Sequence, residues 1–234
     1  MNKHTQTVGV IGGMGPAATL EFAQTVMAMT GAVSDEQHIP MLIDNDTHIP
    51  NRQAAILGDG PSPGPAIAQS GQRLQAAGAD FLVMPCNTAH AFIEELLAAV
   101  SVPFVSILDV SVDACRDYPT VGVLSTRGCL EFGGYQQALT AEGVQVVTPE
   151  DDEVHLLSEL VVQIKSGDID REVRDAMKTH FNALHDRGCD VVLSACTEIP
   201  LVLDATALPC PLICSTRELA KATVSRAKQA RRIS

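Results

Sequence analysis

The sequence predicts an α/β protein of two pseudo-symmetric, doubly wound parallel-sheet domains, with the active site in the cleft between them. Three observations carry this prediction. Short β-branched and apolar runs alternate with segments of helical length, as in parallel βαβ units. Several segments recur in the same order about half a chain apart. A cysteine follows a predicted strand at a matching position in each half.

The repeat is read from three pairs of segments. Residues 8–11 recur at 121–124, residues 80–88 with Cys86 recur at 190–198 with Cys196, and residues 102–105 recur at 208–211. The offsets are 113, 110 and 106 residues, far longer than the period of a solenoid. We therefore predict one domain over residues 1–112 and a second over 113–215. A C-terminal helix, residues 216–234, is expected to pack back on the first domain.

The first half alternates strands with helices. Residues 7–11 form a β-branched run, and the glycine-rich residues 12–15 then predict a turn, with Pro16 suited to the first helical position. Proline and glycine dominate residues 58–65, so 45–65 is predicted as one long loop. The predicted strands are 7–11, 39–43, 81–84 and 104–107, and the predicted helices are 17–29, 66–77 and 88–99.

The second half repeats this alternation. The predicted strands are 121–124, 144–147 and 191–194, and the predicted helices lie near 129–141, 153–165 and 169–186, with a last one from 216. Ligands of such sheets bind beyond the carboxyl ends of the strands. Met14, Cys86, Thr126 and Cys196 each follow a predicted strand, so they are expected to converge on one crevice.

Composition and charge limit the possible functions. The chain has 234 residues, 46% of them hydrophobic and 19% charged, which is typical of one large or two small globular domains. The net charge of −12 argues against nucleic acid or an anionic membrane as a partner. No apolar stretch approaches the roughly 20 residues of a membrane span. The basic residues near the C-terminus are expected on a solvated helix face: Lys221, Arg226, Lys228, Arg231 and Arg232.

The expected compartment is the cytoplasm. The N-terminus lacks the apolar core of a signal peptide. Seven cysteines without a CxxC pair indicate reduced thiols rather than a disulfide framework.

The glycine-rich turn offers a competing interpretation. Residues 13–18 fit the G-x-G-x-x-A pattern of dinucleotide sites. However, Pro16 removes an N–H that would face a pyrophosphate, and the acidic ribose-binding residue would come late, at Asp44. A tight turn close to a small ligand is the preferred interpretation. The histidines are scattered and none completes a zinc spacing with cysteine, so no metal is expected.

Cys86 and Cys196 are the candidate catalytic residues. Each precedes a predicted helix or turn, whose dipole favours the thiolate. Burial in a core is the usual fate of a free cysteine. A matched pair in two copies of one unit instead favours a substrate between two thiols, with a proton removed from one face and returned to the other. The other five cysteines are interpreted as packing residues: Cys115, Cys129, Cys189, Cys210 and Cys214.

Four segments carry a resemblance to a known family: GGMGP at 12–16, IPNR at 49–52, MPCNTAH at 84–90 and CTEIPL at 196–201. Together they resemble the aspartate/glutamate racemase family, in particular its aspartate racemase branch, over nearly the whole chain. The resemblance implies inversion of an acidic amino acid without pyridoxal phosphate or metal, commonly in a homodimer. Ala195 and Ser125 stand where many members have glycine, and neither change removes a functional side chain.

The resemblance also implies roles for individual residues. Cys86 would act on the D-enantiomer and Cys196 on the L-enantiomer. Arg52 would bind the distal carboxylate and Lys165 would close the carboxylate site from the second domain. Glu198 would bind the α-amino group or orient a neighbour.

The remaining contacts are expected around the substrate carboxylates. The α-carboxylate takes up the developing charge and would bind backbone N–H groups and polar side chains. The residues expected there are Asn87, Thr88, Thr126 and Thr197, with further substrate contacts from Met14 and Asn45. Residues 58–65 would form a lid or lie beside one.

Two other functions stay open at this point. The same fold could carry decarboxylation or cis–trans isomerisation of a small dicarboxylate, or the chain could bind an acidic amino acid without turning it over. The choice between aspartate and glutamate also stays open, because one methylene in a pocket is worth only about 1–3 kcal/mol.

Overall fold

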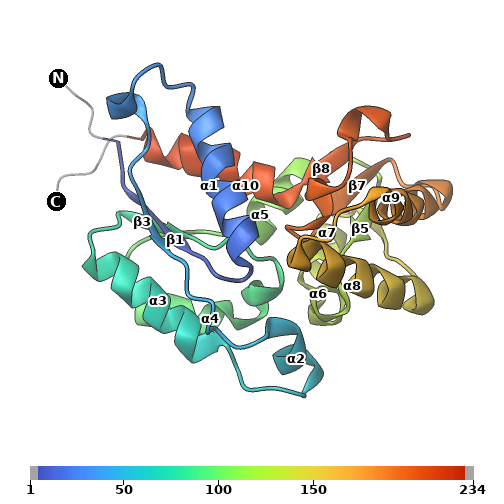
Figure 1. Ribbon diagram of the computed structural model, residues 1–234, viewed down its shortest axis with the longest axis horizontal. Helices are drawn as coiled ribbons and strands as arrows, with labels where there is room; N and C mark the ends of the chain where they lie inside the picture. Colours follow the sequence, from blue (N-terminus) through green and yellow to red (C-terminus); the bar gives the residue numbers. More distant parts are fainter. Residues whose placement is uncertain (1–4, 230–234) are drawn as a thin grey trace.

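The protein consists of two four-stranded parallel sheets with helices on both faces of each, as the computed structural model of residues 5–229 shows (Figure 1). The first sheet has the order β2 (Met41–Asp44), β1 (Val8–Ile11), β3 (Phe81–Val83) and β4 (Phe104–Val105). The second has the order β6 (Gln145–Val147), β5 (Thr120–Leu124), β7 (Val191–Ser194) and β8 (Leu212–Cys214). The two orders are equivalent strand for strand, which confirms the predicted fold class.

Helices alternate with the strands in both halves. The first half contains α1 (Pro16–Thr30), η1 (Asp35–Gln37), α2 (Arg52–Leu57), α3 (Gly64–Ala76), η2 (Thr88–Phe92), α4 (Ile93–Ala99) and α5 (Ile107–Cys115). The second half contains α6 (Arg127–Phe132), α7 (Gly134–Ala141), α8 (Asp151–Ser166), α9 (Arg171–Asp186), η3 (Ile199–Leu201), η4 (Ala205–Ala207) and α10 (Ser215–Ala227).

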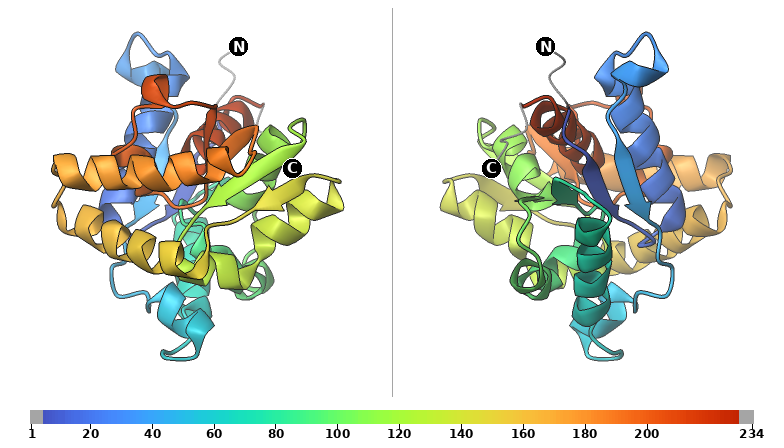
Figure 2. Two further views of the ribbon diagram at one scale, coloured as in Figure 1. Left: turned by 90° about the vertical axis from the view of Figure 1, so that its right-hand side faces the viewer. Right: turned by 90° about the vertical axis from the view of Figure 1, so that its left-hand side faces the viewer.

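Each sheet is covered on both faces, so its central strands are wholly buried, as parallel strands require. In the first half, α1 and α10 pack on one face through Phe22 and Leu219, and α3 and α4 pack on the other through Ile67 and Leu96. In the second half, α8 and α9 lie side by side over one face (Figure 2, left). Helices α6 and α7 cover its other face.

The helix that follows the last strand of each half contributes to the core of the other half. Val112 and Cys115 of α5 pack with β5 and β7, although α5 follows β4. Leu219 and Val224 of α10 pack with β1 and β3, although α10 follows β8. The predicted boundary between residues 112 and 113 therefore falls inside α5, and the division into two domains stays a prediction. Residues 230–234 of the expected C-terminal helix, with Arg231 and Arg232 of the basic tail, lie outside the described residues.

Hydrogen bonds at the start of the strands repeat in the two halves. The carboxylate of Asp80 accepts from the Thr7 N–H at 2.8 Å, and that of Asp190 accepts from the Thr120 N–H at 2.9 Å. The third predicted pair of segments needs a shift of two residues. Leu82 pairs with Phe104 and Val192 with Leu212, so residues 102–105 correspond to 210–213 rather than to 208–211. Proline occurs at both 209 and 211, and the sequence match aligned Pro103 with the first of them instead of the second.

Three predicted elements differ from the structure for local reasons. The expectation of one loop over 45–65 is wrong for α2, because the Asn51 side chain caps its first turn and Gly58 ends it at a φ of 88°. The helix expected near 129–141 is broken into α6 and α7 at Gly133, which has a φ of 70°. The helix expected over 88–99 begins as the 3₁₀ turn η2 before α4.

Candidate active site

A cavity of about 180 Å³ lies where the carboxyl ends of β1, β3, β5 and β7 face one another between the two halves. Ten of the eleven predicted site residues line it: Met14, Arg52, Cys86, Asn87, Thr88, Thr126, Lys165, Cys196, Thr197 and Glu198. The eleventh, Asn45, follows β2, is exposed and is not among the lining residues. Residues 58–65 do not line the cavity either, although the neighbouring α2 does.

The two cysteines occupy equivalent positions in the two halves. Cys86 follows β3 and is 7% exposed, and Cys196 follows β7 and is 9% exposed. Both lie at the cavity wall, so a ligand held there is reached by a thiol from each half. Their shared position follows from the topology, because β3 and β7 are equivalent strands.

Cys196 has an acidic neighbour. Its thiol donates to Oε2 of Glu198 at 3.1 Å, and the Thr197 hydroxyl donates to the same oxygen at 3.0 Å. Burial and then the negative charge of Glu198 raise the pKa of Cys196 well above its usual value, and the ammonium of Lys165 opposes this. Cys196 is therefore held as a thiol in this state.

Lys165 approaches the same carboxylate from α8. Its Nζ lies 3.6 Å from Oε1 of Glu198. Partial burial lowers the pKa of Lys165, but the negative charge of Glu198 opposes this, and the pKa lies above its usual value. Lys165 therefore stays protonated and supplies a cation to the cavity.

A neutral histidine, His90, holds the backbone of Cys86. His90 Nδ1 lies 2.9 Å from the backbone oxygen of Cys86, which can only accept, so Nδ1 carries the proton. Burial lowers the pKa of His90 to about 4, and this backbone contact opposes the shift. The ring also packs at a tilt against Phe104, with 5.6 Å between ring centroids. His90 thus anchors the backbone of Cys86 and is not a base for its thiol.

Asn87 is held from the other half of the protein. The hydroxyl of Tyr135, in α7, donates to Oδ1 of Asn87 at 2.5 Å. Both side chains are buried, and Nδ2 of Asn87 has no hydrogen-bond partner. The sequence prediction did not include Tyr135, because nothing in its local sequence indicates a contact with a residue 48 positions earlier.

Helix α2 brings Arg52 to the cavity. One guanidinium nitrogen of Arg52 donates to the backbone oxygens of Ile49, at 3.1 Å, and Pro50, at 2.9 Å. Gln53 accepts from the N–H of Gly128 at 3.4 Å, and a Cβ on Gly128 would lie 3.0 Å from Cα of Gln53. The missing side chain at 128 lets α2 lie against α6 (Figure 1).

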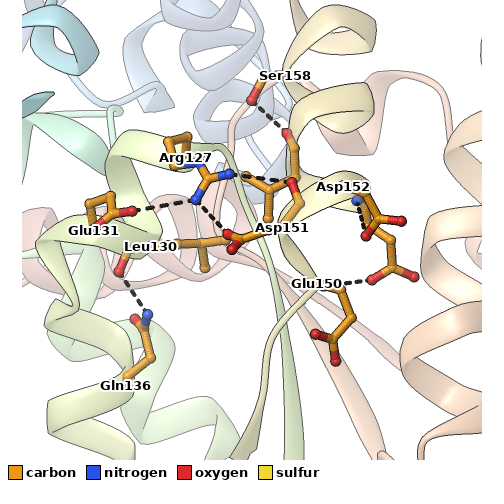
Figure 3. Close-up of polar contacts among 10 residues, drawn as sticks. Arg127, Leu130, Glu131, Gln136, Glu150, Asp151, Asp152 and Ser158 are labelled. Atoms are coloured by element: carbon orange, nitrogen blue, oxygen red, sulfur yellow. Dashed lines mark hydrogen bonds and ion pairs between the residues drawn. The ribbon is translucent and has the colours of Figure 1, made fainter.

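Helix α8 forms one wall of the cavity, and Lys165 is the residue of this wall that the sequence analysis predicted. Ser158, Val161 and Val162 also line the cavity, at the three- and four-residue spacing of one helix face. The start of α8 is tied to α6, because Arg127 donates to Asp151 at 2.7 Å, as Figure 3 shows. Asn51 and Gln53 complete the set of lining residues that were missed.

No group of three or more His, Cys, Asp or Glu side chains among residues 5–229 could hold a metal ion. No helix in the same range is long and apolar enough to cross a membrane.

Comparison with known proteins gives the family. The sequence pattern described as Asp/Glu/Hydantoin racemase matches residues 11–223. The chain belongs to this family. Among its relatives, the broad specificity amino-acid racemase RacX of Bacillus subtilis is 29% identical over 226 residues, which cover 93% of this chain and 96% of RacX.

Solved structures extend the likeness. The aspartate racemase of Picrophilus torridus superposes with a TM-score of 0.86 at 30% identity, over 95% of this chain and 94% of that one. The glutamate racemase of Francisella tularensis, in complex with D-glutamate, has a TM-score of 0.71 at 19% identity, over 95% and 81% of the two chains. At 19% identity, the similarity to the Francisella tularensis enzyme concerns the fold alone. The predicted family resemblance is thereby confirmed.

Proposed function

We propose that the protein is a cofactor-independent racemase of an acidic amino acid that uses Cys86 and Cys196 as its two acid–base groups. The observation that carries the proposal is the placement of both thiols, from equivalent strands of the two halves, on one cavity. A planar carbanion between two such groups can lose a proton on one face and gain one on the other.

The charges of the cavity support an acidic substrate. Its charged lining residues are Arg52, Lys165 and Glu198. An acidic amino acid carries two carboxylates and one ammonium, so two cations and one carboxylate match it in number and sign. Arg52 would bind the distal carboxylate, Lys165 would approach a carboxylate from α8, and Glu198 would receive the ammonium.

The reaction needs no redox step. A thiolate takes the Cα proton, so the Cα–H bond breaks, an S–H bond forms, and the electron pair delocalises into the α-carboxylate. The opposite thiol then delivers its proton, which forms the new Cα–H bond and leaves a thiolate. Asn87, Thr88, Thr126 and Thr197 would stabilise the charge on the α-carboxylate through fixed donors.

The hydrogen bond between Cys196 and Glu198 favours one starting direction. Because its thiol donates to Glu198, Cys196 would act first as the proton donor, and the opposite residue, Cys86, would then be the base for that turnover. The enzyme in this state would accept the D-enantiomer. After one turnover the roles are exchanged, and the L-enantiomer is accepted.

Aspartate is the first substrate candidate, because the aspartate racemase of Picrophilus torridus shares 30% identity over nearly the whole chain. Glutamate is the second. We also propose a homodimer, which size-exclusion chromatography with light scattering would test, and a cytoplasmic location, where the thiols stay reduced.

The test is proton NMR of L-aspartate and L-glutamate in D₂O with reduced, cofactor-free protein, followed by chiral analysis. Loss of the Cα–H signal with appearance of the D-form is the expected result. Cys86→Ser and Cys196→Ser should each abolish racemisation, while Cys210→Ser, outside the cavity, should not. Full racemisation by either active-site variant would overturn the two-thiol proposal. No exchange in the wild type would favour a dicarboxylate lyase or isomerase, or a binding role.

A further inference from the structure

The contact between Tyr135 and Asn87 joins the two halves directly beside one of the candidate catalytic cysteines. Tyr135 lies in α7 and is 1% exposed, and Asn87 follows Cys86 and is 4% exposed. The phenol hydroxyl donates to Oδ1 of Asn87 at 2.5 Å. Burial raises the pKa of Tyr135 well above its usual value, against a hydrogen bond with Ser111 that lowers it, so the hydroxyl keeps its proton.

This hydrogen bond engages the oxygen end of the Asn87 amide. A carboxamide has one oxygen that accepts and one nitrogen that donates twice. Because Tyr135 occupies the oxygen, the nitrogen is the end that remains. Nδ2 is buried without a partner, and Asn87 lines the cavity. A buried N–H without a partner is unfavourable, so this donor is prepared for a ligand acceptor.

We infer that Tyr135 is a positioning residue, which holds the Asn87 amide with its N–H₂ toward the substrate α-carboxylate. This inference rests on the proposed function. Without the phenol hydroxyl the amide could rotate and present its oxygen to the carboxylate, so that two acceptors would face each other. The donor matters most in the transition state, where the α-carboxylate takes up the charge from Cα.

The geometry also couples the two halves. Asn87 belongs to the half that carries Cys86, whereas Tyr135 belongs to the half that carries Cys196. The donor is therefore in its productive orientation only while α7 lies against the Cys86 loop.

The test is a double-mutant cycle with Tyr135→Phe, Asn87→Ala and the combined variant, read as kcat/KM for racemisation. Tyr135→Phe should lower kcat/KM about 10- to 100-fold, the loss expected when the hydrogen bond from Asn87 to the charged carboxylate is no longer made. The fall should be the same for both enantiomers, because a racemase has an equilibrium constant of one. In the Asn87→Ala background the same substitution should change kcat/KM less than twofold. Tyr118→Phe, the chain's other tyrosine and outside the cavity, is the matched control.

A second measurement serves if Tyr135→Phe fails to fold. In the Tyr118→Phe background, 3-fluorotyrosine labels position 135 alone. Its fluorine signal should shift when aspartate binds, and Asn87→Ala should remove that shift. A full loss of activity from Tyr135→Phe in the Asn87→Ala background, or a fluorine shift that survives Asn87→Ala, overturns the inference. Failure of the wild type to exchange the Cα proton would instead overturn the proposed function.

Discussion

The thiol of Cys196 donates a hydrogen bond to Oε2 of Glu198 at 3.1 Å, in the segment where the second half of the chain meets the cavity. The Thr197 hydroxyl donates to the same oxygen, and Lys165 lies 3.6 Å from the other one. This carboxylate thus adds to the effect of burial, and both raise the pKa of the thiol beside it. The equivalent position after Cys86 is Thr88, which carries no charge, so the duplicated halves are chemically unequal at this point.

Replacing Glu198 by Gln should lower the pKa of Cys196. The negative charge of Glu198 raises this pKa, after burial itself, so its removal favours the thiolate. We compare Gln and Glu at position 198 in a Cys86→Ser background. Alkylation of Cys196 by iodoacetamide should become fast at a lower pH with Gln than with Glu. Mass spectrometry of the peptide that holds Cys196 gives the rate. Glu142→Gln, at the exposed end of α7, is the control. An unchanged alkylation profile in Glu198→Gln would contradict the assignment.

Replacing Lys165 by Met should have the opposite effect on the same thiol. The ammonium of Lys165 lowers the pKa of Cys196, so its loss should move alkylation of Cys196 to a higher pH. Turnover of aspartate should also fall about 10- to 100-fold, since a hydrogen bond to a charged group is worth about 1.5–3 kcal/mol. Lys178→Met, on the neighbouring helix α9 and outside the cavity, should change neither. A shift of the alkylation profile in the same direction as for Glu198→Gln would exclude this electrostatic account.

Histidine 90 should make the folded protein less stable at mildly acidic pH. Its pKa is lowered to about 4 by burial, against about 6.5 in an unfolded chain. Between these values the unfolded state binds more protons, so stability is complete above pH 6.5 and falls as the pH drops toward 4. The loss from this residue is at most about 3 kcal/mol, at about 1.4 kcal/mol per pH unit.

Urea unfolding of the wild type and of His90→Gln at several values between pH 4.5 and 7.5 tests this linkage. The variant should be less stable at pH 7.5, because the contact with the Cys86 backbone is altered, but its stability should depend less steeply on pH. His48→Gln is the control, because the side chain of His48 is 97% exposed. Equal slopes in the wild type and in His90→Gln would show that His90 does not carry the dependence.

The sequence predicted those parts of the fold and the site that depend on local pattern. Buried strands such as 8–11 read as continuous apolar runs, and residues that follow strands in parallel sheets must share one edge. For this reason Met14, Cys86, Thr126 and Cys196 were placed together from sequence, and all four line the cavity.

The missed features depend on contacts that are distant in sequence. Asn45 also follows a strand, but β2 is an edge strand and Asn45 is exposed. Tyr135 reaches Asn87 only because α7 lies between the halves. Helix α2 was hidden in a segment rich in proline and glycine, where one capping asparagine was the available signal.

The glycine-rich turn after β1 gives the last prediction, on stability. Gly13 has a φ of 88°, and a Cβ at this position would lie 2.1 Å from the backbone oxygen of Asp46. That backbone has little freedom to move away, because Arg73 binds the carboxylates of Asp44 at 2.6 Å and Asp46 at 3.0 Å. Gly13→Ala should therefore combine the cost of a left-handed conformation, about 1–2 kcal/mol, with a backbone clash.

Gly31→Ala isolates the first of these two costs. Gly31 ends α1 with a φ of 67°, and a Cβ there would meet nothing within 4 Å. In urea unfolding, the Gly31→Ala variant should lose about 1 kcal/mol of unfolding free energy, whereas Gly13→Ala should lose more than about 3 kcal/mol. Because Met14 lines the cavity one residue later, Gly13→Ala should also lower turnover at temperatures where it remains folded, and Gly31→Ala should not. Equal losses of stability in the two variants would mean that the segment around Asp46 yields to the new methyl group, and that the turn is not fixed by this contact.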